Sequence, residues 1–89
     1  MFKALFFIEC APAGAKASID LAHEMTCSGR LPFVPHPGMQ LSVSHDGDYF
    51  TVETVFWKVD VPDVLEVFFR EDMHHDEEYF ARQGWEAVR

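Results

Sequence analysis

The fold is decided by residues 49–69, which read YFTVETVFWKVDVPDVLEVFF. Apolar side chains recur at every second position in this stretch, which is the period of a strand with one buried face. Phe50 and Val52 follow one phase of this alternation, whereas Val55 and Trp57 follow the other. The change of phase between them predicts a β-bulge, which bends a strand as small barrels require.

Further strands are predicted on both sides of this stretch. Residues 61–63 turn the chain into a second alternating strand that ends near Phe69. Residues 2–9 are rich in Phe, contain no Gly or Pro, and predict a strand buried on much of both faces. Asp46-Gly47 is a strong hairpin signal, because these residues adopt the positive φ angles of tight turns. Residues 15–27 alternate like a strand paired with the first one, yet they include good helix formers, so a helix is the alternative there.

The tail changes from a strand pattern to a helix pattern. Acidic residues from Asp76 onward suit the first turn of a helix, Arg82 suits its last turn, and Gly84 is typical of the position after it. We therefore expect a short helix of about two turns in the segment that begins at Met73 and ends before Gly84. Together these segments predict a single domain over residues 1–89, mostly β. Its architecture is a small curved antiparallel sheet or SH3-like barrel of about five strands with one short C-terminal helix.

Leu31–Met39 reads LPFVPHPGM, and its three prolines hold the backbone extended and exclude a central strand. This segment resembles one in a group of small bacterial proteins of unknown function, in which a strand ends in Leu-Pro-Phe-x-Pro-x-x-Gly and leads into a β-hairpin. The ending at residues 80–85, FARQGW, is similar to their C-terminal helix followed by Gly-Trp. The resemblance implies a small barrel or curved sheet with one helix, and it carries no activity or catalytic residue.

The charge of the chain bounds its partners. Fifteen Asp and Glu oppose seven Lys and Arg, for a formal charge of −8, and the basic residues are scattered. Binding to nucleic acid or to anionic lipid needs clustered Lys and Arg, so both are disfavoured. A block of acidic residues predicts an acidic surface, which suits a basic protein partner: Asp60, Asp63, Glu66, Glu71, Asp72, Glu77 and Glu78.

The two cysteines, Cys10 and Cys27, point to a reducing compartment, because a secreted domain of this size usually carries a disulfide framework. A turn near residues 13–14 places Cys10 opposite about residue 18, so the two thiols lie too far apart to bridge. The apolar run at residues 4–8 is too short for a signal peptide, and no run is long enough to span a bilayer. We expect a cytoplasmic protein.

Residues with catalytic or ligand chemistry are few. His74, His75 and Glu78 are the metal-ligand candidates, since His74 and Glu78 share a face if this segment is helical. A Cys–His nucleophile at His23 and Cys27 has no further support in the sequence. His23, His36 and His45 are candidate polar groups for a small ligand at a barrel mouth. No cofactor is predicted, and no residue is assigned a catalytic role.

The aromatic content carries the functional hypothesis. Nine Phe, two Trp and two Tyr exceed what the core of 89 residues needs, and they fall on both faces of the predicted strands. An exposed aromatic face indicates an interface, and the alternative is a closed barrel whose outside is covered by the helix and the proline-rich connector. The candidates are Phe7, Tyr49, Trp57, Phe68 and Trp85. The sequence thus favours a non-enzymatic interaction module with a protein partner, and a homodimer is the alternative way to cover the aromatic surplus. A small-molecule barrel, a modest enzyme using its histidines, and a metal site are the other hypotheses.

Overall fold

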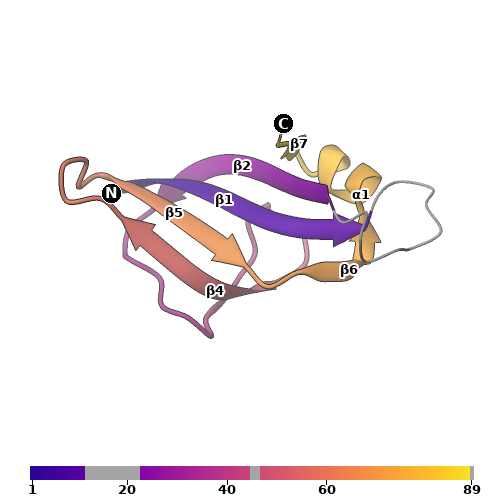
Figure 1. The fold of residues 1–89 in the computed structure, drawn as a ribbon, viewed down its shortest axis with the longest axis horizontal. Coiled ribbons are helices and arrows are strands. Elements are labelled where there is room, and N and C mark those ends of the chain that lie inside the picture. Colours follow the sequence, from indigo (N-terminus) through magenta and orange to yellow (C-terminus); the bar gives the residue numbers. More distant parts are fainter. Residues whose placement is uncertain (12–22, 45–46, 89) are drawn as a thin grey trace.

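The computed structural model describes residues 1–11, 23–44 and 47–88. In Figure 1 the strands lie side by side as one curled sheet with a short helix at one end. Seven strands and one helix are described: β1 (Phe2–Ala11), β2 (His23–Leu31), β3 (Gln40–Leu41), β4 (Phe50–Trp57), β5 (Val64–Phe69), β6 (Asp72–Asp76), α1 (Glu77–Arg82) and β7 (Glu86–Ala87). The sheet forms a half barrel, which confirms the predicted fold class.

The sheet has the order β3-β4-β5-β1-β2-β7, with β6 paired to the end of β1. Strand β1 lies in the middle, antiparallel to β2 and parallel to both β5 and β6. A purely antiparallel sheet was therefore the wrong expectation. Parallel neighbours need a long crossover connection, and the alternation of apolar residues does not reveal the direction of a partner strand.

Residues 23–27 of the predicted strand pair antiparallel with β1 as expected, whereas residues 15–22 lie outside the described residues. The register differs from the expected one. Cys10 lies opposite His23, and Cys27 lies opposite Phe6. The expected partner of Cys10, residue 18, falls outside the described residues. Cys10 and Cys27 are both free thiols.

The inner face of the curled sheet carries the core. Every second residue of β1 from Ala4 to Cys10 is buried, and so are Leu65, Val67 and Phe69 of the neighbouring β5. Phe80 of α1 and Trp85 close one end of this face, with their ring centroids 5.3 Å apart. The proline-rich connector contributes the buried Pro35 and the partly buried Met39.

The predicted bulge in β4 is present. The pairing of β4 with β5 shifts between Val52 and Thr54. Val52 pairs with Phe69 before the shift, and Val55 pairs with Val67 after it, so both phases of the alternation contribute to the same inner face. The bulge therefore moves Phe56, which shares the even numbering of Val52, to the outer face.

The helix begins later than expected, at Glu77. Asp76 is its N-cap and accepts a hydrogen bond from the Tyr79 N–H at 3.0 Å. Gly84 has a φ of 94°, and the Trp85 N–H donates to the Phe80 carbonyl oxygen, which together form a Schellman ending. Residues 72–76 are a strand because they extend the parallel pairing along β1, and a local helix pattern gives no information about that pairing.

Candidate protein-interaction surface

Three phenyl rings form a continuous row across the outer face of the sheet, and we call Phe7, Phe68 and Phe56 the aromatic row. Phe7 of β1 pairs directly with Phe68 of β5, and their rings stack with centroids 4.7 Å apart. Phe56 of β4 meets Phe68 edge-on at 5.5 Å. Phe7 and Phe68 are half-buried, whereas Phe56 is 54% exposed. No helix among the described residues covers this face. In Figure 1 the helix lies at one end of the sheet and not in front of β1, β5 and β4.

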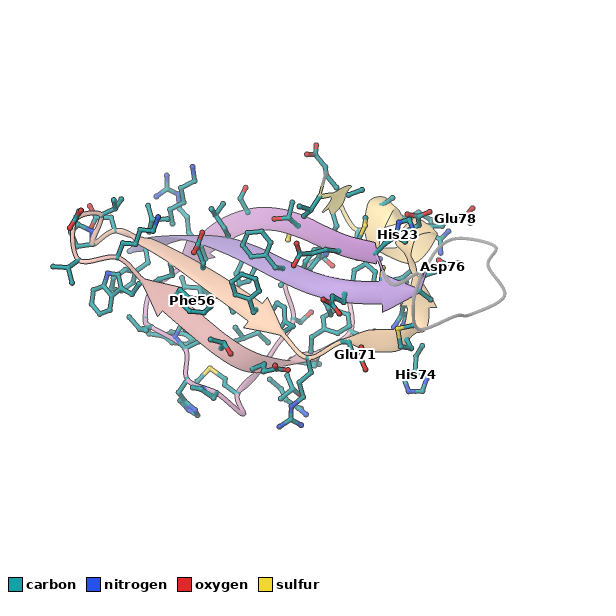
Figure 2. The ribbon with its side chains drawn as sticks, viewed as in Figure 1. His23, Phe56, Glu71, His74, Asp76 and Glu78 are labelled. Carbon is teal, nitrogen blue, oxygen red and sulfur yellow. The ribbon has the colours of Figure 1, made fainter. Side chains whose placement is uncertain are left out.

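A pocket of about 530 Å³ opens at one end of the aromatic row. Phe7 and Phe68 contribute to its wall, together with Ile8 and Phe69. Four carboxylates and one guanidinium complete the lining, and we call this hollow the acidic pocket: Glu9, Glu24, Glu53, Glu71 and Arg70. Figure 2 places Glu71 beyond the end of β5 and Phe56 on β4, towards the other end of the row. Negative charge thus gathers beside exposed apolar surface.

The predicted interface residues are separated by the fold. Phe7 and Phe68 come together in the aromatic row. Trp57 follows the inner phase of β4, and it packs on Phe2 at the end of the sheet with a centroid distance of 5.9 Å. Tyr49 is exposed in the segment before β4 and does not belong to the row. Trp85 was a wrong prediction, since it is only 4% exposed and belongs to the core against Phe80 and Phe69.

The acidic block at residues 60–78 does not form one surface. Asp60 and Asp63 lie in the turn between β4 and β5, whereas Glu77 and Glu78 lie on α1. Asp72 faces His75, whose ring nitrogen Nδ1 is 2.5 Å from its carboxylate. From the predicted block, Glu71 lines the acidic pocket. Glu66 lies on the outer face, two positions before Phe68 of the aromatic row. The strands divide the block because successive segments of it belong to different ends of the sheet.

His75 has the most contacts among the four histidines that the structure describes. Its Nδ1 contacts Asp72, and its Nε2 lies 2.8 Å from an Asp48 carboxylate oxygen. Its ring packs on Tyr79 with centroids 4.0 Å apart. Asp72 also accepts a hydrogen bond from the His74 N–H at 2.9 Å. These contacts tie the segment before β4 to β6, which is a structural role that accounts for every ring nitrogen of His75.

The three metal-ligand candidates do not converge. His74 belongs to β6 and not to a helix, and Figure 2 shows its side chain pointing away from the side of α1 that carries Glu78. Both ring nitrogens of His75 already face carboxylates. Among the described residues, no group of three or more His, Cys, Asp or Glu side chains is placed to hold a metal ion. The shared helical face on which this candidate depended is absent.

The histidines proposed for a ligand site are also separated. His23 is exposed at the start of β2, and its Nδ1 lies 3.2 Å from a Glu77 carboxylate oxygen. His36 is exposed in the connector, where its Nδ1 contacts the Pro37 carbonyl oxygen. His45 lies outside the described residues. The inner face of the sheet is filled by the core, so the described residues form no barrel mouth that His23 and His36 share.

The thiols are not poised for nucleophilic chemistry. Burial raises the pKa of Cys27 to about 12. The pKa of Cys10 rises to about 11, first through burial and then through the negative charges of Glu77, Asp72 and Asp76. A reactive thiol needs a lowered pKa, so both cysteines are protonated at neutral pH. His23 and Cys27 point to the same face of β2 but lie four residues apart along the strand, and His23 faces Glu77 instead.

Sequence reasoning missed Phe56 and three of the pocket carboxylates, Glu9, Glu24 and Glu53. Phe56 was assigned no face because the bulge position was not used to place the residues after it. Glu9, Glu24 and Glu53 come from three different strands, and only the register of β1 with its neighbours brings them together. Alternation in β1 and β2 does place Glu9 and Glu24 outward, so the available signal was the shared outer face.

Within the described residues, no helix reaches the length and hydropathy that crossing a bilayer requires. Compared with known protein families, curated proteins and solved structures, the chain shows no match.

Proposed function

We propose that this domain is a non-enzymatic interaction module that docks a basic protein partner on the outer face of its sheet. The observation that supports the proposal is the aromatic row, three neighbouring Phe rings of which Phe56 is exposed and the other two are half-buried, with no helix of the described part of the chain over them. Exposed aromatic groups of this kind mark protein interfaces, where they provide large contact area at low cost in side-chain entropy.

Charge selects the partner class. The carboxylates beside the row oppose an acidic or nucleic-acid partner and favour a basic one, since complementary fields speed and orient association. The two free thiols suit a reducing compartment, which supports the proposal of a cytoplasmic module. A second copy of the chain is the competing occupant of the same face.

The test is a set of pull-downs from a lysate of the source cells, with four baits washed at low and moderate salt. The baits are the wild type, Phe68→Ser, Phe56→Ser and the control Tyr49→Ser. Tyr49 is the matched control because it is an exposed aromatic residue outside the row. Circular dichroism and thermal melting of each bait verify that it is folded. Phe56 is included because a substitution at this exposed position destabilises the fold least.

The expected result is a basic protein retained by the wild type and by Tyr49→Ser, lost from both row variants, and weakened at higher salt. The proposal is wrong if all four folded baits retain the same proteins, or if none retains any. It is also wrong about the occupant if size-exclusion chromatography shows a wild-type dimer that Phe68→Ser converts to a monomer.

A further inference from the structure

We infer that the partner presents an alternating basic and apolar segment, with an apolar side chain on the aromatic row and an arginine or lysine side chain in the acidic pocket. This inference rests on the proposed function, because it names the ligand of the same outer face. Its two halves depend on two different features of that face, which are the exposed rings and the carboxylate lining of the pocket.

The apolar half follows from the geometry of the row. Phe7 and Phe68 stack with their planes only 14° apart, and Phe56 stands nearly perpendicular to Phe68 at 89°. The three rings therefore offer a shallow surface with no hydrogen-bonding group of their own. An aliphatic or aromatic side chain laid across them gains burial without leaving a polar atom unpaired.

The basic half follows from the charges around the pocket. Its four carboxylates stand against the single guanidinium of Arg70, so the pocket is strongly negative overall. Glu53 and Glu71 are exposed and Glu24 is half-buried, which leaves them free of the cost that full burial places on a charge. A cation that enters gains attraction from several carboxylates and also meets the Phe7 and Phe68 rings, whose faces attract cations.

The two features are adjacent, and this adjacency specifies a segment instead of an isolated residue. Phe7 and Phe68 belong both to the row and to the pocket lining. One ligand chain can therefore place neighbouring side chains on both features at once. An extended strand turns successive side chains to opposite faces, so residues two apart in the ligand would point to this surface together.

The experiment titrates the full chain with three labelled peptides and follows fluorescence anisotropy. The first peptide repeats two leucines followed by two arginines. In an extended strand, each face of this peptide then carries leucine and arginine in turn. The second replaces arginine with glutamate, and the third replaces leucine with serine. We expect the first to bind the most tightly, the glutamate peptide not to bind, and the serine peptide to bind about tenfold more weakly, a difference of about 1.4 kcal/mol.

A charge-matched pair of variants locates the cation. Glu24→Gln with Glu53→Gln removes two pocket carboxylates, and the control Glu78→Gln with Glu86→Gln removes two exposed carboxylates from α1 and β7. We expect about three- to tenfold weaker binding for the pocket pair and no change for the control, since solvent-facing ion pairs each contribute modestly. Higher salt should weaken wild-type binding more than it weakens binding to the pocket pair.

Amide chemical shifts complete the test and keep it separate from the proposed function. Shifts clustered at Phe7, Glu9, Phe68 and Glu71 support the inference. Equal affinity for the arginine and glutamate peptides, equal losses in the two charge pairs, or shifts on another face would overturn it. If the peptides fail while a Phe68-dependent partner is recovered from lysate, the ligand class is wrong and the docking face stands. If both fail, the proposed function is wrong as well.

Discussion

Phe7 and Phe68 stack on the exposed side of the sheet, at the same level of two parallel strands, with ring centroids 4.7 Å apart. A stacked pair at this distance is stabilising in the free protein. The aromatic row is therefore held in place before any partner arrives. Its surface is ordered by the same pairing that joins β1 to β5, so binding does not have to order these rings.

The coupling between Phe7 and Phe68 is measurable in a double-mutant cycle. Phe7→Ala, Phe68→Ala and the double variant should give an interaction energy of about 0.5–1.5 kcal/mol in denaturant unfolding. The control cycle pairs Phe7→Ala with Tyr49→Ala, which lie apart and should be additive within about 0.5 kcal/mol. Additive effects for the first cycle would mean that the stacked geometry contributes no stability.

Phe80 should be the most sensitive aromatic position in the core. Its side chain is fully buried between Phe50 and Trp85, so Phe80→Ala is expected to lower the free energy of unfolding by about 3–5 kcal/mol. Because this loss can abolish folding in a small domain, Phe80→Leu is the companion variant, with an expected loss of about 1–3 kcal/mol. Phe56→Ala on the outer face should cost under about 1 kcal/mol. Urea titration decides, and equal losses for Phe80→Leu and Phe56→Ala would contradict the assignment of the two faces.

The two carboxylates that hold His75 should differ in their contribution to stability. The Asp72 side chain is 10% exposed and accepts hydrogen bonds from the His74 N–H and from His75, whereas the Asp48 side chain is 63% exposed. Asp72→Asn is expected to lower stability by about 1–3 kcal/mol, and Asp48→Asn by under about 1 kcal/mol. Thermal melting at pH 7 compares them. A larger effect at Asp48 would show that the segment before β4 depends on that ion pair.

The buried thiols should make the fold sensitive to alkali. Their pKa values, about 11 for Cys10 and about 12 for Cys27, lie above the ordinary value of about 8.5 in an unfolded chain. Below pH 8 both states keep the protons, and the full contribution to stability is present. As pH rises above 8.5, the unfolded state ionises first, so stability falls progressively towards pH 12.

The thiol contribution is isolated by comparison with a Cys10→Ala, Cys27→Ala variant. Urea midpoints of the wild type should fall more steeply between pH 8 and pH 11 than those of the variant, which lacks both thiols. Alkylation by iodoacetamide at pH 8 should be slow in the native protein and fast in urea, because the thiolate is the reactive form. Parallel midpoint curves for the two proteins would contradict the raised pKa values.

Local patterns predicted the fold class, the bulge in β4 and the Gly84 helix ending, because each depends on residues close in the sequence. The alternation of residues 49–69 sets strand periods, and the phase change marks the bulge directly. Strand direction was not predictable in the same way. Nothing in the alternation of residues 2–9 distinguishes a parallel partner from an antiparallel one, so the β1–β5 pairing was missed.

The candidate surface shows the same division. Phe7 and Phe68 were identified as surplus aromatic residues from their own strands, and the structure joins them. The acidic pocket depends on non-local register, and its carboxylates come from β1, β2, β4 and the segment after β5. Residues 72–76 show the opposite error, since their acidic, helix-like composition is local and the parallel pairing with β1 overrides it.

The central position of β1 also has a consequence for how the chain is made. The parallel ladder between Ala4 and Leu65 can form only after Leu65 has been synthesised. At a translation rate of about 5–20 residues per second, this takes several seconds after the synthesis of Ala4. During this interval the Phe-rich strand has β2 as its only early neighbour among the described strands, with one edge open. Such a segment is a ready substrate for chaperones and for aggregation between nascent chains. Completion of the sheet therefore depends on synthesis reaching β5, and the speed of translation across residues 11–64 sets how long the open edge persists.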